Sequence, residues 1–151
     1  MSDINEKLKV LAKDLTKDYP SGPRRLIGGY VLAARTLDKC RAVLAGTAGE
    51  YHFNCPLDRM FFDFSQIDAA AFKSIVASGA TDDEVSVWVA QNAKPSRQDI
   101  IRWNNQMRDK RISDLPIELQ EYMEDYIPKF IPRNRVVYHF FDVYDIEEQR
   151  L

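Results

Sequence analysis

Hydrophobic residues recur at steps of three and four between Pro23 and Gly46. This spacing places them along one side of an α-helix. Proline suits the first turn of a helix, and glycine suits the left-handed position just after the last turn. We therefore predict one long amphipathic helix over residues 24–45, with Arg35 and Lys39 on its polar side. Its apolar positions are Leu26, Ile27, Tyr30, Ala33, Ala34, Leu37, Cys40 and Leu44.

Two features of this predicted helix depart from ordinary helix preferences. Arg24 and Arg25 would lie in the first turn, where the helix dipole is already positive. Gly28 and Gly29 follow one turn later, although glycine costs roughly 1 kcal/mol relative to alanine in a helix. Both features fit an anion that rests on the helix N-terminus and needs close approach of the backbone. They also fit a pair of arginines that are solvated or paired with carboxylates elsewhere, beside glycines that let another helix pack closely, and arrangements without a ligand are common at helix N-termini.

Further helices are predicted on both sides of this segment. Residues 4–15 have helical spacing, so residues 1–20 form an N-terminal helix or an arm that orders on docking. Residues 57–64 read as a short core helix, and Asp68 is a good N-cap for the next one. Thr81 and Ser96 then begin two similar segments, each with an acid three residues later, as in a capping box. We expect these two segments to form a helical hairpin.

Each of these two segments carries a tryptophan, Trp88 and Trp103. Tryptophan is favoured both in protein cores and at the centres of interfaces. The pair therefore indicates either core packing or a partner-binding groove, and core packing is the interpretation we adopt.

The C-terminal part of the chain has two interpretations. Pro116 begins a helix that Pro128 is expected to end. Residues 135–151 then predict either a buried strand or a final helix, followed by an acidic tail. The predicted fold is mainly α: a compact single-domain helical bundle over residues 1–151, with six or seven helices. One short strand pair, 51–54 against 136–140, is an optional addition.

The net charge, the apolar runs and the cysteine count bear on which partners and which compartment we expect. The 151 residues hold 21 Lys and Arg against 23 Asp and Glu, for a formal charge of -2. Binding to nucleic acid requires a basic surplus or face, so we expect no nucleic-acid partner. We also expect no membrane span and no secretion signal, because no apolar run is long enough. These features and the two cysteines, Cys40 and Cys55, predict a cytoplasmic protein with reduced thiols.

The chain also resembles a known family. The runs SGPRRLIGGYVLAARTLDKCRAVLAGTAGEYHFNCPLDRMFFDF, TDDEVSVWV and IIRWN are similar to the bacterial family catalogued as domain of unknown function 5069. The similarity extends over nearly the whole chain. It implies a small bacterial protein made of this one domain, and it brings no activity, cofactor or catalytic residue with it.

An enzymatic function is one hypothesis. Asp38, Arg41, His52 and Cys55 lie near one another in sequence, and a thiol beside a base or a positive charge becomes nucleophilic. We expect no metal site, because the chain has no paired Cys or His spacing of the kind that zinc sites use. No phosphate-binding glycine motif is present, and we expect no cofactor.

A binding function without catalysis is the preferred hypothesis. Its ligand would be a small anion or an acidic segment of a partner protein, held by basic side chains at the start of the predicted helix. An acidic tail that folds back onto these arginines is the alternative, as is a protein that serves only in assembly, of unknown oligomeric state. The predicted contact residues are Arg24, Arg25, Gly28, Gly29, Tyr30, Asp38 and Arg41.

Overall fold

The computed structural model describes residues 3–151, which form eight α-helices, one 3₁₀ helix and no β-strand. This confirms the mainly α prediction, while the optional strand pair is absent from these residues. Residues 51–52 are irregular and residues 53–54 form a turn, while residues 135–138 are irregular and α8 begins at residue 140. The helices are α1 (Asp3–Leu11), α2 (Ala33–Ala45), α3 (Pro56–Ser65), α4 (Ala69–Ala77), α5 (Asp82–Asn92), α6 (Arg97–Asp109), α7 (Ile117–Phe130) and α8 (Phe140–Glu147), with η1 (Ile112–Asp114) before α7.

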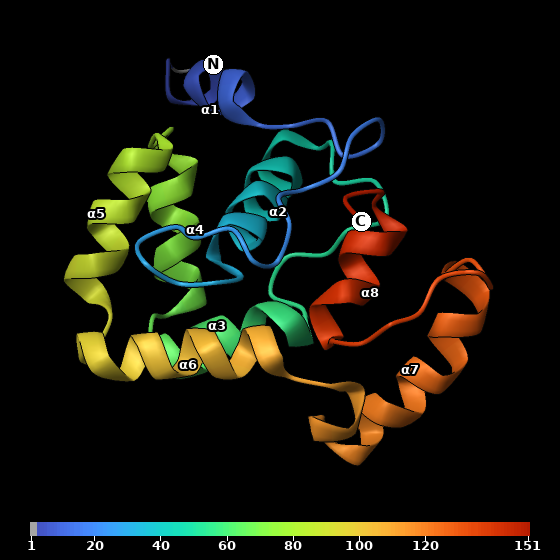
Figure 1. The fold of residues 1–151 in the computed structure, drawn as a ribbon. Coiled ribbons are helices and arrows are strands. Elements are labelled where there is room, and N and C mark those ends of the chain that lie inside the picture. Colours follow the sequence, from blue (N-terminus) through green and yellow to red (C-terminus); the bar gives the residue numbers. More distant parts are fainter. Residues whose placement is uncertain (1–2) are drawn as a thin grey trace.

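Helix α2 lies at the centre of the molecule, with the other helices arranged around it (Figure 1). Residues 33–42 are all buried, including four charged side chains. A helix that is surrounded on all sides is normally apolar throughout, so these charges require partners inside the protein. The prediction that Arg35 and Lys39 lie on a solvent-facing side is therefore wrong.

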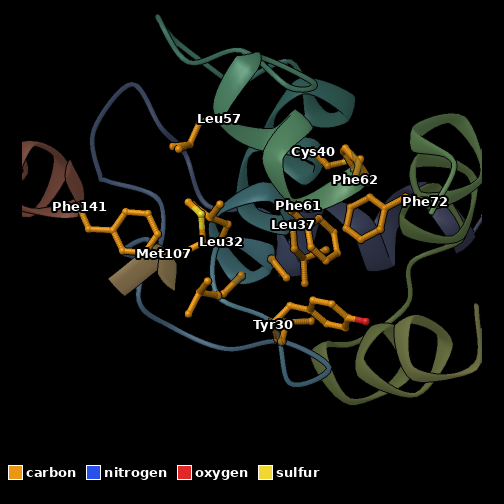
Figure 2. Packing of buried hydrophobic residues seen from close by; sticks show 14 of the residues in the cluster. Tyr30, Leu32, Leu37, Cys40, Leu57, Phe61, Phe62, Phe72, Met107 and Phe141 are labelled. Atoms are coloured by element: carbon orange, nitrogen blue, oxygen red, sulfur yellow. The ribbon is translucent and has the colours of Figure 1, made fainter. Parts of the chain in front are cut away.

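Aromatic side chains fill the core beside α2, as Figure 2 shows. Tyr30 and Phe61 pack edge to face with ring centroids 5.4 Å apart. Trp103 stacks on Phe64 at 4.6 Å, and Trp88 packs against the ring of Phe72. Both tryptophans are partly buried and pack against the core, as the core interpretation predicted.

The predicted helix over residues 24–45 begins at Ala33 instead. Gly28 and Gly29 have φ angles of 62° and 89°, in the left-handed region that a right-handed helix excludes. They occupy the middle of a tight turn, in which Tyr30 N donates to Ile27 O over 3.1 Å. Two adjacent residues at positive φ are the signature of a hairpin-type turn, which two glycines form at little steric cost. Arg24 and Arg25 therefore lie in the loop before α2 and not in its first turn.

Several local signals in the second half of the chain are confirmed. Asp68 caps α4, Thr81 and Glu84 form the capping box of α5, and Ser96 caps α6. The expected hairpin of α5 and α6 is wrong, because α6 leaves α5 at a corner instead of running back along it (Figure 1). Helix α7 also continues past Pro128 to Phe130.

Candidate functional site

A pocket of about 540 Å³ opens between α2, α7, α8 and the loop that joins α2 to α3. We call it the tyrosine pocket, because five of its lining residues are tyrosines. It brings together residues from distant parts of the sequence. Its lining residues are Tyr19, Arg35, Lys39, Glu50, Tyr51, His52, Cys55, Leu57, Tyr122, Tyr126, Phe130, Tyr144, Glu147 and Glu148.

One wall of the tyrosine pocket is built on a buried ion pair between α2 and the end of α8. Arg35 donates two hydrogen bonds of 2.7 Å to the two carboxylate oxygens of Glu148. Tyr51 donates to the same carboxylate over 2.8 Å. The Arg35 guanidinium also lies 4.9 Å from the ring centre of Tyr144. This arrangement holds both tyrosines in fixed positions around one cation.

The ion pair controls the protonation of both of its members. Burial alone would favour neutral Glu148, but the hydrogen bonds from Arg35 hold the pKa of Glu148 below its ordinary value. Burial likewise works against the charged guanidinium, and the Glu148 carboxylate holds the pKa of Arg35 above its ordinary value. Both groups therefore stay charged near neutral pH.

A second buried cation, Lys39, lies one turn further along α2. Its ammonium group is 2.9 Å from Asp58 Oδ1 and donates to Cys55 Sγ over 3.2 Å. Asp58 also accepts hydrogen bonds from Thr36 Oγ1 and from the backbone N–H of Asn54. Lys39 is only 3% exposed, so this pair anchors the start of α3 to the central helix.

Helix α7 forms the opposite wall of the tyrosine pocket. Tyr122, Tyr126 and Phe130 follow one another along this helix, with ring centroids 5.6 Å and 4.4 Å apart. The hydroxyl of Tyr126 donates to Glu147 Oε1 at the end of α8. Partial burial raises the pKa of Glu147, and the bond from Tyr126 offsets only part of this effect. Among the ion pairs of residues 3–151, none joins Glu147 to a basic side chain.

Comparison with known proteins places the chain in a family. The sequence model of the family described as "Domain of unknown function (DUF5069)" matches residues 17–150. The chain belongs to this family. The match includes every residue that lines the tyrosine pocket in this DUF5069 protein. A comparison with curated proteins gives no match.

The arginines at positions 24 and 25 have carboxylate partners within the chain, and Arg25 shares its partner with Arg41. Arg24 bonds to Asp142 and Asp145 of α8, and Arg25 lies 3.3 Å from Asp82. Thus the acidic tail folds back onto Arg24, which was the alternative that the sequence left open. Because neither arginine is part of the first turn of α2, the electrostatic reason to expect an anion there is removed.

The other predicted site residues do not gather in one place. Asp38 and Arg41 do not pair: Asp38 accepts two hydrogen bonds from Ser21, and Arg41 bonds to Asp82 and to the backbone carbonyl of Ala80. Tyr30 is buried in the core. Gly28 packs against α5, where an added Cβ would lie 2.7 Å from a methyl group of Val89, and Gly29 has open space around it.

Two of the four residues of the enzymatic hypothesis, His52 and Cys55, line the tyrosine pocket, whereas Asp38 and Arg41 do not. Sequence reasoning missed Glu147 and the tyrosines of α7 as site residues. Their only signal is the spacing of Tyr122 and Tyr126, which gives one helical face but does not say what that face meets.

Within residues 3–151, no group of three or more His, Cys, Asp or Glu side chains is placed to share a metal ion. In the same residues, no helix combines the length and the apolar character that a bilayer crossing demands.

Proposed function

We propose that this protein binds a small organic cation in the tyrosine pocket. The observation that carries the proposal is the position of Glu147. This carboxylate faces a cavity lined by tyrosines and has a tyrosine hydroxyl, instead of a basic group, as its partner. An organic ammonium group would supply the missing positive charge.

The balance of charge in the tyrosine pocket favours a cation over an anion. Its two basic side chains already have carboxylate partners, Arg35 with Glu148 and Lys39 with Asp58. Glu147 and the exposed Glu50 are left as the uncompensated charges of the lining. An anionic ligand would have to displace one of the internal carboxylates from a buried cation. Breaking a buried ion pair is unfavourable, because the displaced carboxylate loses its partner.

The walls of the pocket support the same ligand class. The faces of aromatic rings attract cations, by about 0.5–1 kcal/mol at exposed sites and about 2 kcal/mol when the cation is desolvated. Tyr122, Tyr126 and Phe130 supply such rings beside Glu147. The volume of about 540 Å³ lies within the range of ordinary small-molecule pockets.

This proposal agrees with the sequence-based hypothesis of a binding protein without catalysis. It differs in the location of the site and in the charge of the ligand, which is positive instead of negative. A bacterial origin and a cytoplasmic location are part of the same proposal. Both cysteines are free thiols, which supports a reducing compartment.

Titration with choline and with its uncharged carbon analogue, 3,3-dimethylbutan-1-ol, tests the proposal. The two molecules share one shape, so a difference between them reports the charge. We expect choline to bind about tenfold or more tightly, equivalent to about 1.4 kcal/mol, in calorimetric or NMR titrations. The Glu147→Gln variant should lose most of this preference for choline and keep only the part that the aromatic rings supply. Equal binding of the two molecules to the wild-type protein would refute the proposal.

Two controls accompany this experiment. Glu124→Gln removes the same charge from an exposed position of α7 outside the pocket lining, and should leave choline binding unchanged. The pH dependence is the second control. Because burial raises the pKa of Glu147, choline affinity should fall as pH is lowered through that raised value, and Glu147→Gln should abolish this dependence.

A further inference from the structure

One sulfur atom in the tyrosine pocket lies beside a buried ammonium group. Cys55 Sγ is 3.2 Å from Lys39 Nζ, and the Cys55 side chain is half-buried and lines the cavity. We propose that Cys55 is a reactive thiol that undergoes exchange with small disulfides. This role does not depend on the cation-binding function of the same pocket.

The position of the ammonium group is fixed by its other partner. Asp58 receives hydrogen bonds of 2.7 Å from Thr36 and 2.8 Å from the backbone N–H of Asn54, so the carboxylate cannot rotate freely. It therefore holds Lys39 Nζ at 2.9 Å, with the remaining ammonium hydrogens available to the sulfur. A thiolate at Cys55 would meet a positive charge that is already in place.

The N-terminus of α3 is a second feature that stabilises a thiolate at Cys55. Cys55 is the N-cap residue of this helix, and Pro56 is its first helical residue. The N-terminus of a helix carries a partial positive charge that stabilises an anion placed there. Lys39 and the helix dipole come from different elements, so the two contributions are independent of each other.

The other cysteine provides a contrast within the same chain. Cys40 is fully buried in the core, where Figure 2 shows it next to Phe62. Burial raises the pKa of the Cys40 thiol to about 12. This thiol should therefore stay unreactive while the protein is folded, and it serves as an internal control.

The proposed step conserves atoms and electrons. The Cys55 thiolate attacks one sulfur of a disulfide RSSR, and a new S–S bond forms as the old one breaks. The departing RS⁻ takes up a proton from solvent. Cys55 is oxidised to a mixed disulfide, and the other half of the reagent is reduced to a thiol.

The test uses bis(2-hydroxyethyl) disulfide. This reagent is uncharged, so the charges of the pocket neither attract nor repel it, and the rate reports the reactivity of the thiol. The rate of mixed-disulfide formation at neutral pH is followed by mass spectrometry of the folded protein. We expect modification at Cys55 alone, and a rate about tenfold lower in the Lys39→Met/Asp58→Asn double variant, which removes both charges together. An unchanged rate in that variant would overturn the proposal.

A second variant covers the case in which the double variant does not fold. Lys39→Gln keeps a donor for Asp58 but removes the positive charge, and because the Asp58 carboxylate then acts alone on the sulfur we expect a slowing of about tenfold or more. Circular dichroism establishes that each variant is folded. Modification of Cys40 in the folded wild-type protein would also contradict the proposal. Cys55→Ser should abolish labelling. Labelling of Cys55 in a wild-type protein that fails to prefer choline over its uncharged analogue would leave this inference standing while the proposed function fails, which separates the two.

Discussion

Gly28 and Gly29 prevent the central helix from extending back to Arg24, and Leu32 marks its start. Both residues have positive φ angles, as does Leu32 at 71°, and no right-handed helix continues through such positions. The two glycines have different surroundings, however. An added methyl group at Gly28 would overlap a side chain of α5, whereas one at Gly29 would meet nothing within 4 Å. A comparison of the same substitution at these two positions therefore separates the effect of backbone strain from that of packing.

We predict that Gly28→Ala destabilises the protein more than Gly29→Ala. Gly29→Ala adds only the strain of a left-handed alanine, about 1–2 kcal/mol. Gly28→Ala adds the same strain and the cost of overpacking against Val89, about 1–3 kcal/mol more. Urea denaturation of the two variants measures the difference. Equal losses would contradict the close packing of the turn against α5.

At the scale of elements, α2 is held in the core by ion pairs that other segments provide. Arg35 is paired with Glu148 after α8, Lys39 with Asp58 of α3, and both pairs are almost completely buried. Removal of one member of a buried pair leaves an uncompensated charge in a poorly solvated place. The contacts between α2 and its neighbours therefore depend on charge as well as on apolar area.

We predict that Glu148→Gln lowers the free energy of unfolding by about 3 kcal/mol or more, because Arg35 stays charged and loses its carboxylate. The exposed pair between Arg59 and Asp63 on α3 is the matched control, and Asp63→Asn should cost less than about 1 kcal/mol. An Arg35→Met/Glu148→Leu double variant should recover most of the loss. Thermal or urea unfolding of the three variants provides the comparison, and similar losses for the buried and exposed pairs would argue against this account.

At the scale of the whole molecule, α8 and the residue after it connect the C-terminal part of the chain to the loop before α2 and to α2 itself. Asp142 and Asp145 bind Arg24 in the loop before α2, and Glu148 binds Arg35 within α2. Hydrogen bonds from Arg24 hold the pKa of Asp142 below its ordinary value although burial opposes this, and Arg35 does the same for Glu148. These links couple the stability of the fold to pH.

We predict that the free energy of unfolding falls as pH decreases below about 4.5. A carboxyl whose pKa is lowered in the folded state stabilises the fold above its ordinary pKa, and this contribution is lost as pH falls through the folded value. Asp142 and Glu148 both act in this direction. Glu147, whose pKa is raised, acts in the opposite direction and offsets part of the loss. Urea unfolding between about pH 6 and pH 3 measures the trend, which Arg24→Met should weaken.

Local signals in the sequence predicted the mainly helical fold and many of its boundaries. The caps at Asp68 and Thr81, and the glycine after α2, depend on hydrogen bonds within a few residues, so a short stretch of sequence contains all the necessary information. The start of α2 was predicted wrongly because apolar spacing continued through the two glycines, which are also the signal of a tight turn.

The candidate site could not be predicted in the same way. Arg35 and Lys39 look like residues of a solvated helix face, and only the tertiary structure places Glu148 and Asp58 against them. The tyrosine pocket joins α2, α7 and α8, which are far apart in the sequence. Capping and helical periodicity are short-range properties that the sequence by itself determined. Burial and the pairing of charges are long-range properties, and the tertiary structure decided them because they depend on which surfaces meet.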